Sequence, residues 1–248
     1  RDRDGVDAGR GGDDAQRDAV ATEPRSKPLI VSTDLDPGDP LGVDPVGEIV
    51  ELGEGVTERA IGQRVVTTPW RSRPIGPLDA VGMQHHGGYA EYVKLPAHAT
   101  VPIPDGLGYA EACITARHAP QAFNLLRDRA GLKPGESVLV MGAAGGLGSA
   151  GVQVAKLLGA KVIAAAGAPE RVAAAVALGA DQGIDYRAED LTARVLELTD
   201  GAGVDVVFEN IADPVLFPQA FAAIARHGRL VTAGSHGGGT VPLDAKRL

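Results

Sequence analysis

The chain has 248 residues, a formal net charge of −8 and 44% apolar residues. This length allows two modest domains, each with its own core. The negative charge argues against a nucleic-acid partner or an anionic membrane surface, and no apolar run reaches the roughly 20 residues that span a bilayer. The single cysteine, Cys113, excludes an internal disulfide and a multi-cysteine zinc site. No signal peptide is visible, so we expect a cytoplasmic protein by default.

The first part of the chain divides into a tail and a strand-rich domain. Residues 1–25 are charged, glycine-rich and without apolar periodicity. They bury too little surface to offset their ordering entropy, so we expect a disordered tail. Residues 26–122 contain short apolar runs bounded by glycine or proline at 47–52, 63–68, 89–93 and 99–103. This pattern predicts a partly open, β-barrel-type domain, and a helix expected at 119–129 would join it to the next domain.

The remainder of the chain, 123–248, alternates regularly between apolar runs and helical patterns. Strands are predicted at 137–142, 161–166, 182–186, 204–209 and 229–233, with helices at 146–158, 169–178, 188–199 and 214–225. Five such repeats predict an α/β domain with a doubly wound parallel sheet. A complete fold of this kind has six strands, so we expect the sixth to be missing.

A cluster of glycines follows the first strand of this second domain. The order of strand, glycine turn, helix and strand is that of a dinucleotide-binding unit, in which glycines admit a pyrophosphate and helix amides point at its charge. Ala143 replaces the first glycine of the usual G-x-G-x-x-G pattern. The alternative is a turn that only connects strand to helix, and the flanking elements favour binding. The predicted phosphate-binding residues are Ala144, Gly145, Gly146, Leu147 and Gly148.

The end of the second strand indicates which ribose the site accepts. Gly167 stands where an acidic residue would bind an unmodified ribose and repel a 2′-phosphate. Arg171 offers a forked cation to a phosphate, and Tyr186 adds a hydroxyl group. We therefore predict NADP(H) rather than NAD(H). Two observations leave NAD(H) open as the alternative. Glu170 lies close enough to replace the missing acid, and Arg171 could be an ordinary solvent-exposed residue of a helix.

Two polar loops follow the fourth and fifth strands, where ligands of open α/β sheets bind. Asn210 and Asp213 lie in the first loop, and Gly234, Ser235 and His236 lie in the second. We expect both loops to line the nicotinamide side of the site. Alternatively, Asn210 caps the helix that follows it, and His236 is a solvent-exposed loop residue. For His236 we favour this alternative, because no partner for it can be identified.

No metal site is predicted from these residues. His85 and His86 are adjacent, so on a strand they would point to opposite faces and could not easily share one ion. We interpret Cys113 as a small buried apolar residue rather than a nucleophile.

Several motifs in fixed order carry a family resemblance over about residues 39–248. They are the segments 42–56 (GVDPVGEIVELGEGV), 62–66 (GQRVV), 87–93 (GGYAEYV) and 130–136 (AGLKPGE), the glycine motif, and 178–181 (LGAD) followed by Asp185 and Tyr186. The chain resembles the medium-chain dehydrogenase/reductase superfamily, and in particular its zinc-independent, zeta-crystallin-like quinone oxidoreductase branch. The resemblance implies a GroES-like catalytic domain, a Rossmann-type cofactor domain, and an active site in the cleft between them.

The same resemblance implies chemistry without zinc. Val43 stands where zinc-dependent relatives have a ligand histidine, and Arg117 falls near the place of a ligand cysteine. The implied reaction is hydride transfer from NADPH to a small molecule, either a quinone or an activated alkene or carbonyl compound, which needs no metal.

The resemblance also implies segments that we expect this chain to lack. Relatives begin with a longer β-rich segment and end with a sixth strand that pairs two subunits of a homodimer. A homodimer is therefore left open. Two alternative functions stay open as well: a non-catalytic NADPH-binding fragment, and a relative of zinc-type alcohol dehydrogenases.

Overall fold

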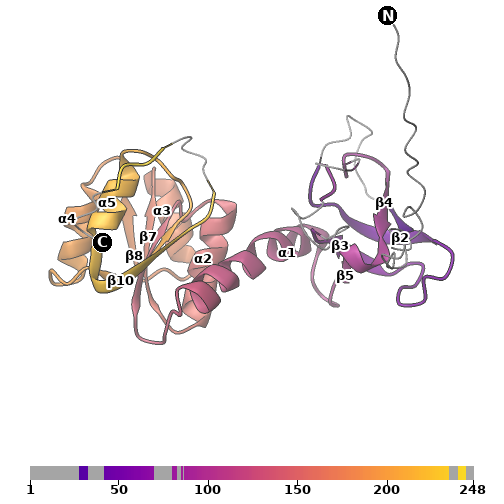
Figure 1. Ribbon diagram of the computed structural model, residues 1–248, viewed down its shortest axis with the longest axis horizontal. Coiled ribbons are helices and arrows are strands. Elements are labelled where there is room, and N and C mark those ends of the chain that lie inside the picture. The colour runs from indigo at the N-terminus through magenta and orange to yellow at the C-terminus, as the bar shows by residue number, and fades with distance from the viewer. Residues whose placement is uncertain are drawn as a thin grey trace, which may run out of the picture.

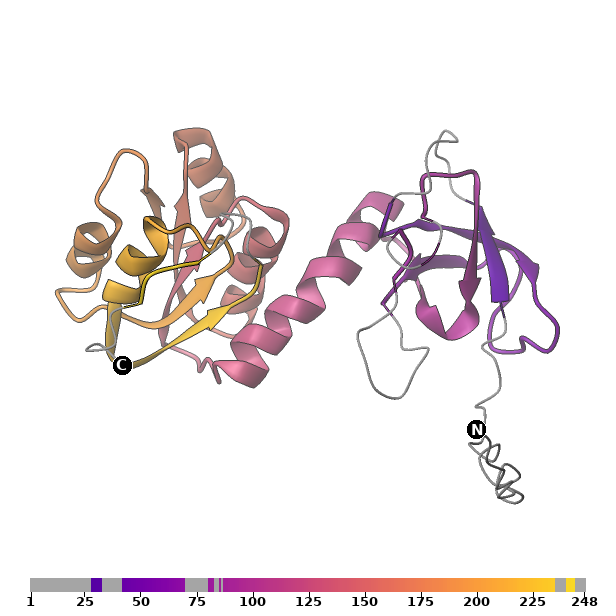
Figure 2. The same cartoon turned by 45° about the horizontal axis from the view of Figure 1, so that its top comes forward.

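The computed structural model describes residues 28–32, 42–69, 80–82, 85, 87–234 and 240–243, with the backbone alone for 28–32. Two units lie at opposite ends of helix α1 (Tyr109–Phe123), as Figures 1 and 2 both show. The expected tail at 1–25 lies outside the described residues, as do Ser235 and His236. The expected domain boundary after residue 122 falls at the end of α1, and it stays a prediction.

The first unit is an antiparallel sheet that confirms the β-rich, GroES-like expectation. Its strands are β1 (Pro28–Ser32), β2 (Val46–Leu52), β3 (Arg64–Thr67), β4 (Tyr92–Pro96) and β5 (Thr100–Pro102), in the order β4-β1-β2-β3-β5. A short 3₁₀ turn, η1 (Ala97–Ala99), joins the last two. Alternate residues such as Ile49, Val93 and Leu95 are buried and pack together, because successive side chains of a strand point to opposite faces.

One predicted strand of this unit begins in a different place. The run at 89–93 was expected to be extended throughout, but β4 begins only at Tyr92. The backbone amide of Gly88 donates a 2.9 Å hydrogen bond to the carbonyl of Gly42, and Gly88 itself is pressed against Pro45. These contacts lie at the start of a bend over residues 88–91, just before β4, and such long-range contacts could not be read from the alternation of side chains.

Helix α1 is longer toward its N-terminus than the sequence predicted. The helix was expected at 119–129, but it begins at Tyr109, and the π-helical segment η2 (Asn124–Arg129) continues it. Pro120 lies inside α1, although proline has no amide hydrogen to donate and is typical of a helix start. Arg64 of β3 lies over the ring of Tyr109 at 4.6 Å, which helps to fix the first turn of the helix against the sheet.

The second unit is a five-stranded parallel sheet with helices on both faces. Its elements are β6 (Ser137–Met141), α2 (Gly146–Leu157), β7 (Lys161–Ala166), α3 (Pro169–Ala177), β8 (Gln182–Asp185), α4 (Leu191–Leu198), β9 (Val204–Glu209), α5 (Leu216–Ala222) and β10 (Ile224–Thr232). The strand order is β10-β9-β6-β7-β8, so the first strand of the unit is central. This confirms the predicted doubly wound, Rossmann-type sheet and its five strands.

Two apolar layers hold this sheet between its helices. Val138 and Val140 of β6 face η2, α2 and α3, whereas Leu139 and Met141 face α4 and α5. Figures 1 and 2 show α2 on one side of the sheet and α4 and α5 on the other. A strand buried on both faces has the continuous apolar pattern that the sequence displays here. No helix among the described residues is both long enough and apolar enough to cross a membrane.

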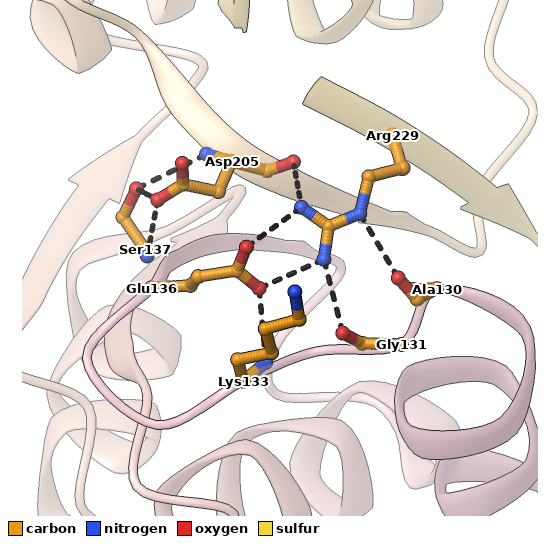
Figure 3. Close-up of polar contacts among 7 residues, drawn as sticks. All are labelled: Ala130, Gly131, Lys133, Glu136, Ser137, Asp205 and Arg229. Carbon is orange, nitrogen blue, oxygen red and sulfur yellow. Dashed lines mark hydrogen bonds and ion pairs between the residues drawn. The ribbon is translucent and has the colours of Figure 1, made fainter. Parts of the chain in front are cut away.

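Strand β10 is held to the sheet by an arginine as well as by its backbone. Regular parallel pairing with β9 covers Arg229 to Thr232, and a register shift separates it from the bridge at Ile224. The Arg229 guanidinium makes a two-pronged contact with Glu136, at 3.0 and 2.8 Å, and also donates to the carbonyls of Ala130 and Gly131 (Figure 3). This cluster ties the edge strand to the loop that leads from η2 into β6.

The hydrogen bonds from Arg229 are the main cause that lowers the pKa of Glu136 below its ordinary value, and the amide of Lys133 adds to the effect. A carboxyl group with a lowered pKa stabilises the fold at pH values above its ordinary pKa. That contribution is lost as the pH falls through the lowered pKa.

We therefore expect Arg229→Met to reduce the free energy of unfolding by about 2 kcal/mol at pH 7, and by less at an acid pH below the ordinary pKa of glutamate, because the ion pair then contributes less. Urea unfolding at both pH values measures the difference. Arg127→Met is the control, because the Arg127–Asp128 pair is largely exposed and solvent screens it. A destabilisation by Arg229→Met that does not change with pH would contradict the assignment.

Candidate functional site

The turn between β6 and α2 brings a strand end and a helix start into backbone contact. Gly142 has a φ of +58°, a left-handed conformation that favours glycine. A Cβ atom at Gly148 would overlap the carbonyl oxygen of Gly142, so the helix can approach this closely only with glycine there. The first helical backbone bond of α2 runs from the Ser149 amide to the Gly145 carbonyl, which leaves the amides of residues 146–148 without a partner within the helix.

A pocket of about 430 Å³ opens beside this turn, at the carboxyl ends of the parallel strands. It is lined by Gly142, Ala144, Gly145, Ala166, Gly167, Arg171, Tyr186, Asn210 and Ile211. Six of the predicted site residues thus come together although they lie on four separate segments. Sequence reasoning missed Gly142, Ala166 and Ile211. Each of these lies at or just beyond the end of a strand, which was the available signal.

Tyr186 lies directly over Gly167 at one end of the pocket. A Cβ atom at Gly167 would be 2.8 Å from the ring carbon Cε2 of Tyr186 and 2.9 Å from its hydroxyl oxygen. Glycine at this position therefore leaves room for the ring of Tyr186, and both residues line the pocket. Arg171 is an exposed residue of α3 that lines the same pocket, whereas Glu170 does not line it.

Asn210 is a buried pocket residue rather than a helix cap. Its side chain is 9% exposed, and its Nδ2 donates a 2.8 Å hydrogen bond to the carbonyl of Met141 at the end of β6. In the turn that leads into α5, it is Asp213 whose Oδ1 accepts hydrogen bonds from the amides of Val215 and Leu216. Asp213 does not line the pocket, so its carboxylate organises the helix start beside the site.

The other predicted residues take different places. Gly146, Leu147 and Gly148 form the first turn of α2, and Gly234 follows β10; none of them lines the pocket. A Cβ atom at Gly146 would overlap the imidazole of His118 on α1, a contact that sequence reasoning did not anticipate. Burial lowers the pKa of His118 below its ordinary value, and the neighbouring charge of Arg117 lowers it further.

The described residues around Asp44 do not suit a zinc ion. The nearest charged partner of the Asp44 carboxylate is Arg117, with 3.5 Å between Oδ1 and the guanidinium nitrogen. The Cys113 thiol donates to the backbone carbonyl of Asp44, and burial together with the Asp44 charge raises the pKa of that thiol. The Arg117 guanidinium repels a metal ion, and a protonated Cys113 thiol is a poor metal ligand. No group of three or more ligating side chains occurs in the described ranges, which omit His86.

The fold and the pocket together define a class of protein. A parallel sheet in the order β10-β9-β6-β7-β8, with a glycine turn after its central strand and a pocket at the strand ends, is a Rossmann-type nucleotide-binding architecture. An antiparallel unit precedes it in the chain.

Comparison with known proteins identifies both units. Residues 25–105 match the alcohol dehydrogenase GroES-like domain family, and residues 146–248 match the zinc-binding dehydrogenase family. A quinone oxidoreductase-like protein 2 homolog from Nematostella vectensis is 36% identical over 84% of this chain and 53% of its own length. A solved NAD-dependent alcohol dehydrogenase is 31% identical with a TM-score of 0.77, covering 89% of this chain and 74% of the other. The Escherichia coli quinone oxidoreductase complexed with NADPH is 25% identical with a TM-score of 0.74, covering 89% and 69%.

The chain therefore belongs to the medium-chain dehydrogenase/reductase superfamily, and within it to a quinone oxidoreductase-like branch. It spans 53% to 58% of the length of the curated quinone oxidoreductases it matches.

The glycine turn gives a prediction that does not depend on function. Gly148→Ala should lower the free energy of unfolding by at least about 2 kcal/mol, because the new Cβ atom meets backbone that cannot move aside. Gly145→Ala is the matched control: its added Cβ would be 3.3 Å from the Gly142 carbonyl oxygen, a much milder contact, so it should lower the melting temperature far less than Gly148→Ala. Thermal unfolding of both variants measures this, and equal melting temperatures would contradict the close approach.

Proposed function

We propose that this chain is an NADPH-dependent oxidoreductase of the quinone reductase type, which transfers hydride to a quinone or to an activated alkene or carbonyl compound. The observation that carries the proposal is the pocket at the strand ends, which joins the glycine turn, Arg171 and Tyr186 in one cavity. Similarity to quinone oxidoreductases, one of them solved as a complex with NADPH, supports it. The chain spans only part of the length of its relatives, so the activity of the full-length relatives is proposed for it and not taken as given.

Each part of the pocket has a role in the proposal. The backbone of the Gly142–Gly145 turn and the start of α2 bind the pyrophosphate, because glycines admit it and helix amides favour its charge. Arg171 and the Tyr186 hydroxyl bind the 2′-phosphate. Asn210 and Ile211 hold the nicotinamide half of the cofactor. The cofactor supplies the hydride, and the protein binds and orients it.

We further propose that the reaction needs no zinc. The pairing of Asp44 with Arg117 and the raised pKa of the Cys113 thiol support this, since neither group is then a good ligand. No general acid is assigned, because a quinone that accepts a hydride can take its proton from water.

Two other functions have specific support. Similarity to a solved NAD-dependent alcohol dehydrogenase favours a zinc-type alcohol dehydrogenase relative. A pocket built entirely from residues of the second unit supports a chain that binds NADPH without turning it over.

Calorimetric titration with NADPH and NADH tests the cofactor assignment. We expect wild-type protein to prefer NADPH, and Arg171→Gln to weaken NADPH binding roughly 10- to 100-fold with little effect on NADH, because it removes a charged hydrogen bond to phosphate. Arg187→Gln is the matched control, since Arg187 is an exposed arginine just beyond β8 that does not line the pocket. Equal affinities for the two cofactors would overturn the NADPH assignment.

Zinc content and quinone reduction test the chemistry. We expect protein purified without chelator to hold far less than one zinc per chain and to oxidise NADPH in the presence of a quinone, at a rate that a chelator leaves unchanged. Stoichiometric zinc with alcohol oxidation would favour the alcohol dehydrogenase alternative. NADPH binding with no hydride transfer to any quinone, enone or activated carbonyl compound would favour the non-catalytic one.

A further inference from the structure

A buried carboxyl group lies beside the pocket without lining it. Glu209 is the last residue of β9 and is 1% exposed. Its Oε1 accepts hydrogen bonds from the amides of Ile211 and Ala212, at 2.8 and 2.9 Å, and its Oε2 accepts one from the Thr232 hydroxyl at 3.1 Å. A carboxyl group taken out of water needs such partners, and here the loop after β9 and the end of β10 provide them.

The two hydrogen bonds from backbone amides to Glu209 constrain the loop that follows β9. Ala212 has a φ of +54°, a left-handed conformation that is uncommon for alanine and persists only where its surroundings enforce it. The hydrogen bond from the Ala212 amide to Glu209 is one such constraint. Between them lie Asn210 and Ile211, both of which line the pocket. Glu209 thus holds the backbone that presents these two side chains.

Glu209 also connects this loop to the neighbouring strand. The Thr232 side chain donates to its carboxyl group, and the Ala233 amide donates to its backbone carbonyl at 3.0 Å. Gly234 comes one residue later. The segments after β9 and β10, both of which were expected to line the site, therefore share one anchor.

We propose that Glu209 is a positioning residue for the cofactor pocket: its buried carboxyl group fixes the loop that presents Asn210 and Ile211 to the ligand. This inference rests on the proposed NADPH-binding function. It assigns Glu209 no contact with cofactor or substrate, because its side chain points into the loop backbone and not into the pocket.

A residue with the same kind of contacts at the other end of the same strand provides a matched control. Asp205 lies near the start of β9, and its Oδ2 accepts hydrogen bonds from both the amide and the hydroxyl of Ser137, each at 2.8 Å (Figure 3). Removing either carboxyl group leaves a backbone donor without its partner. Only Glu209 lies at the carboxyl end of the strand, beside the pocket.

The experiment compares Glu209→Ala, Glu209→Gln and Asp205→Ala with wild-type protein, by melting temperature and by NADPH dissociation constant measured well below every melting temperature. Glu209→Ala should weaken NADPH binding about 10-fold, because two amides of the loop lose their acceptor. Glu209→Gln should restore affinity to within about threefold of wild type, since its amide oxygen can accept from both loop amides and its NH₂ group can donate to the Thr232 oxygen. Asp205→Ala should melt at a lower temperature but bind NADPH as wild type does.

The outcomes separate this inference from the function on which it rests. Wild-type affinity in Glu209→Ala would overturn the positioning role while leaving NADPH binding intact. An equal loss of affinity in Asp205→Ala would also overturn it, because the effect would then follow stability alone. Wild-type protein that binds no NADPH would overturn the proposed function and the inference with it.

Discussion

The backbone contact between Gly142 and Gly148 is the constraint on which the cofactor-type unit depends. It sets how closely α2 approaches the end of β6, and β6 is the central strand on which the neighbouring strands align. A side chain at Gly148 would separate helix from strand, since its Cβ atom would meet the backbone of Gly142. A side chain at Gly142 would instead meet Asn210 in the loop after β9. The pocket lies beside this contact, since Gly142 and Gly145, the N-cap residue of α2, both line it.

Three polar residues at the carboxyl end of β9 each hydrogen-bond a different part of the surrounding backbone. Asn210 links the pocket to the end of β6, Asp213 accepts from amides of the turn into α5, and Glu209 accepts from amides of the loop between Asn210 and Asp213. All three are bound to backbone groups of this region, so their geometry is set before any ligand arrives. A preformed site loses less ordering entropy when it binds, which is why residues that never touch a ligand can affect its affinity.

Helix α1 carries contacts of both units within two adjacent residues. Arg117 pairs with Asp44 of the first unit, and His118 packs against Gly146 at the start of α2. Burial and the Arg117 charge both lower the pKa of His118, which disfavours a protonated imidazole beside the glycine turn. The segment that links the two units is therefore a helix, and His118 on it contacts the start of α2 directly.

The sequence by itself determined the second unit almost completely, because its strands and helices follow local periodicities and its glycine turn requires particular residues at fixed spacing. Predicted and observed bounds differ there by only a few residues for most elements, with β10 the longest departure. Tertiary structure alone decided that α1 continues through Pro120, that Tyr186 covers Gly167, and that the Asn210 side chain bonds the end of β6. It also brought His118 to Gly146 and buried Glu209 beneath the loop. These features join residues distant in the chain or depend on where a side chain points, and local periodicity contains no information about either.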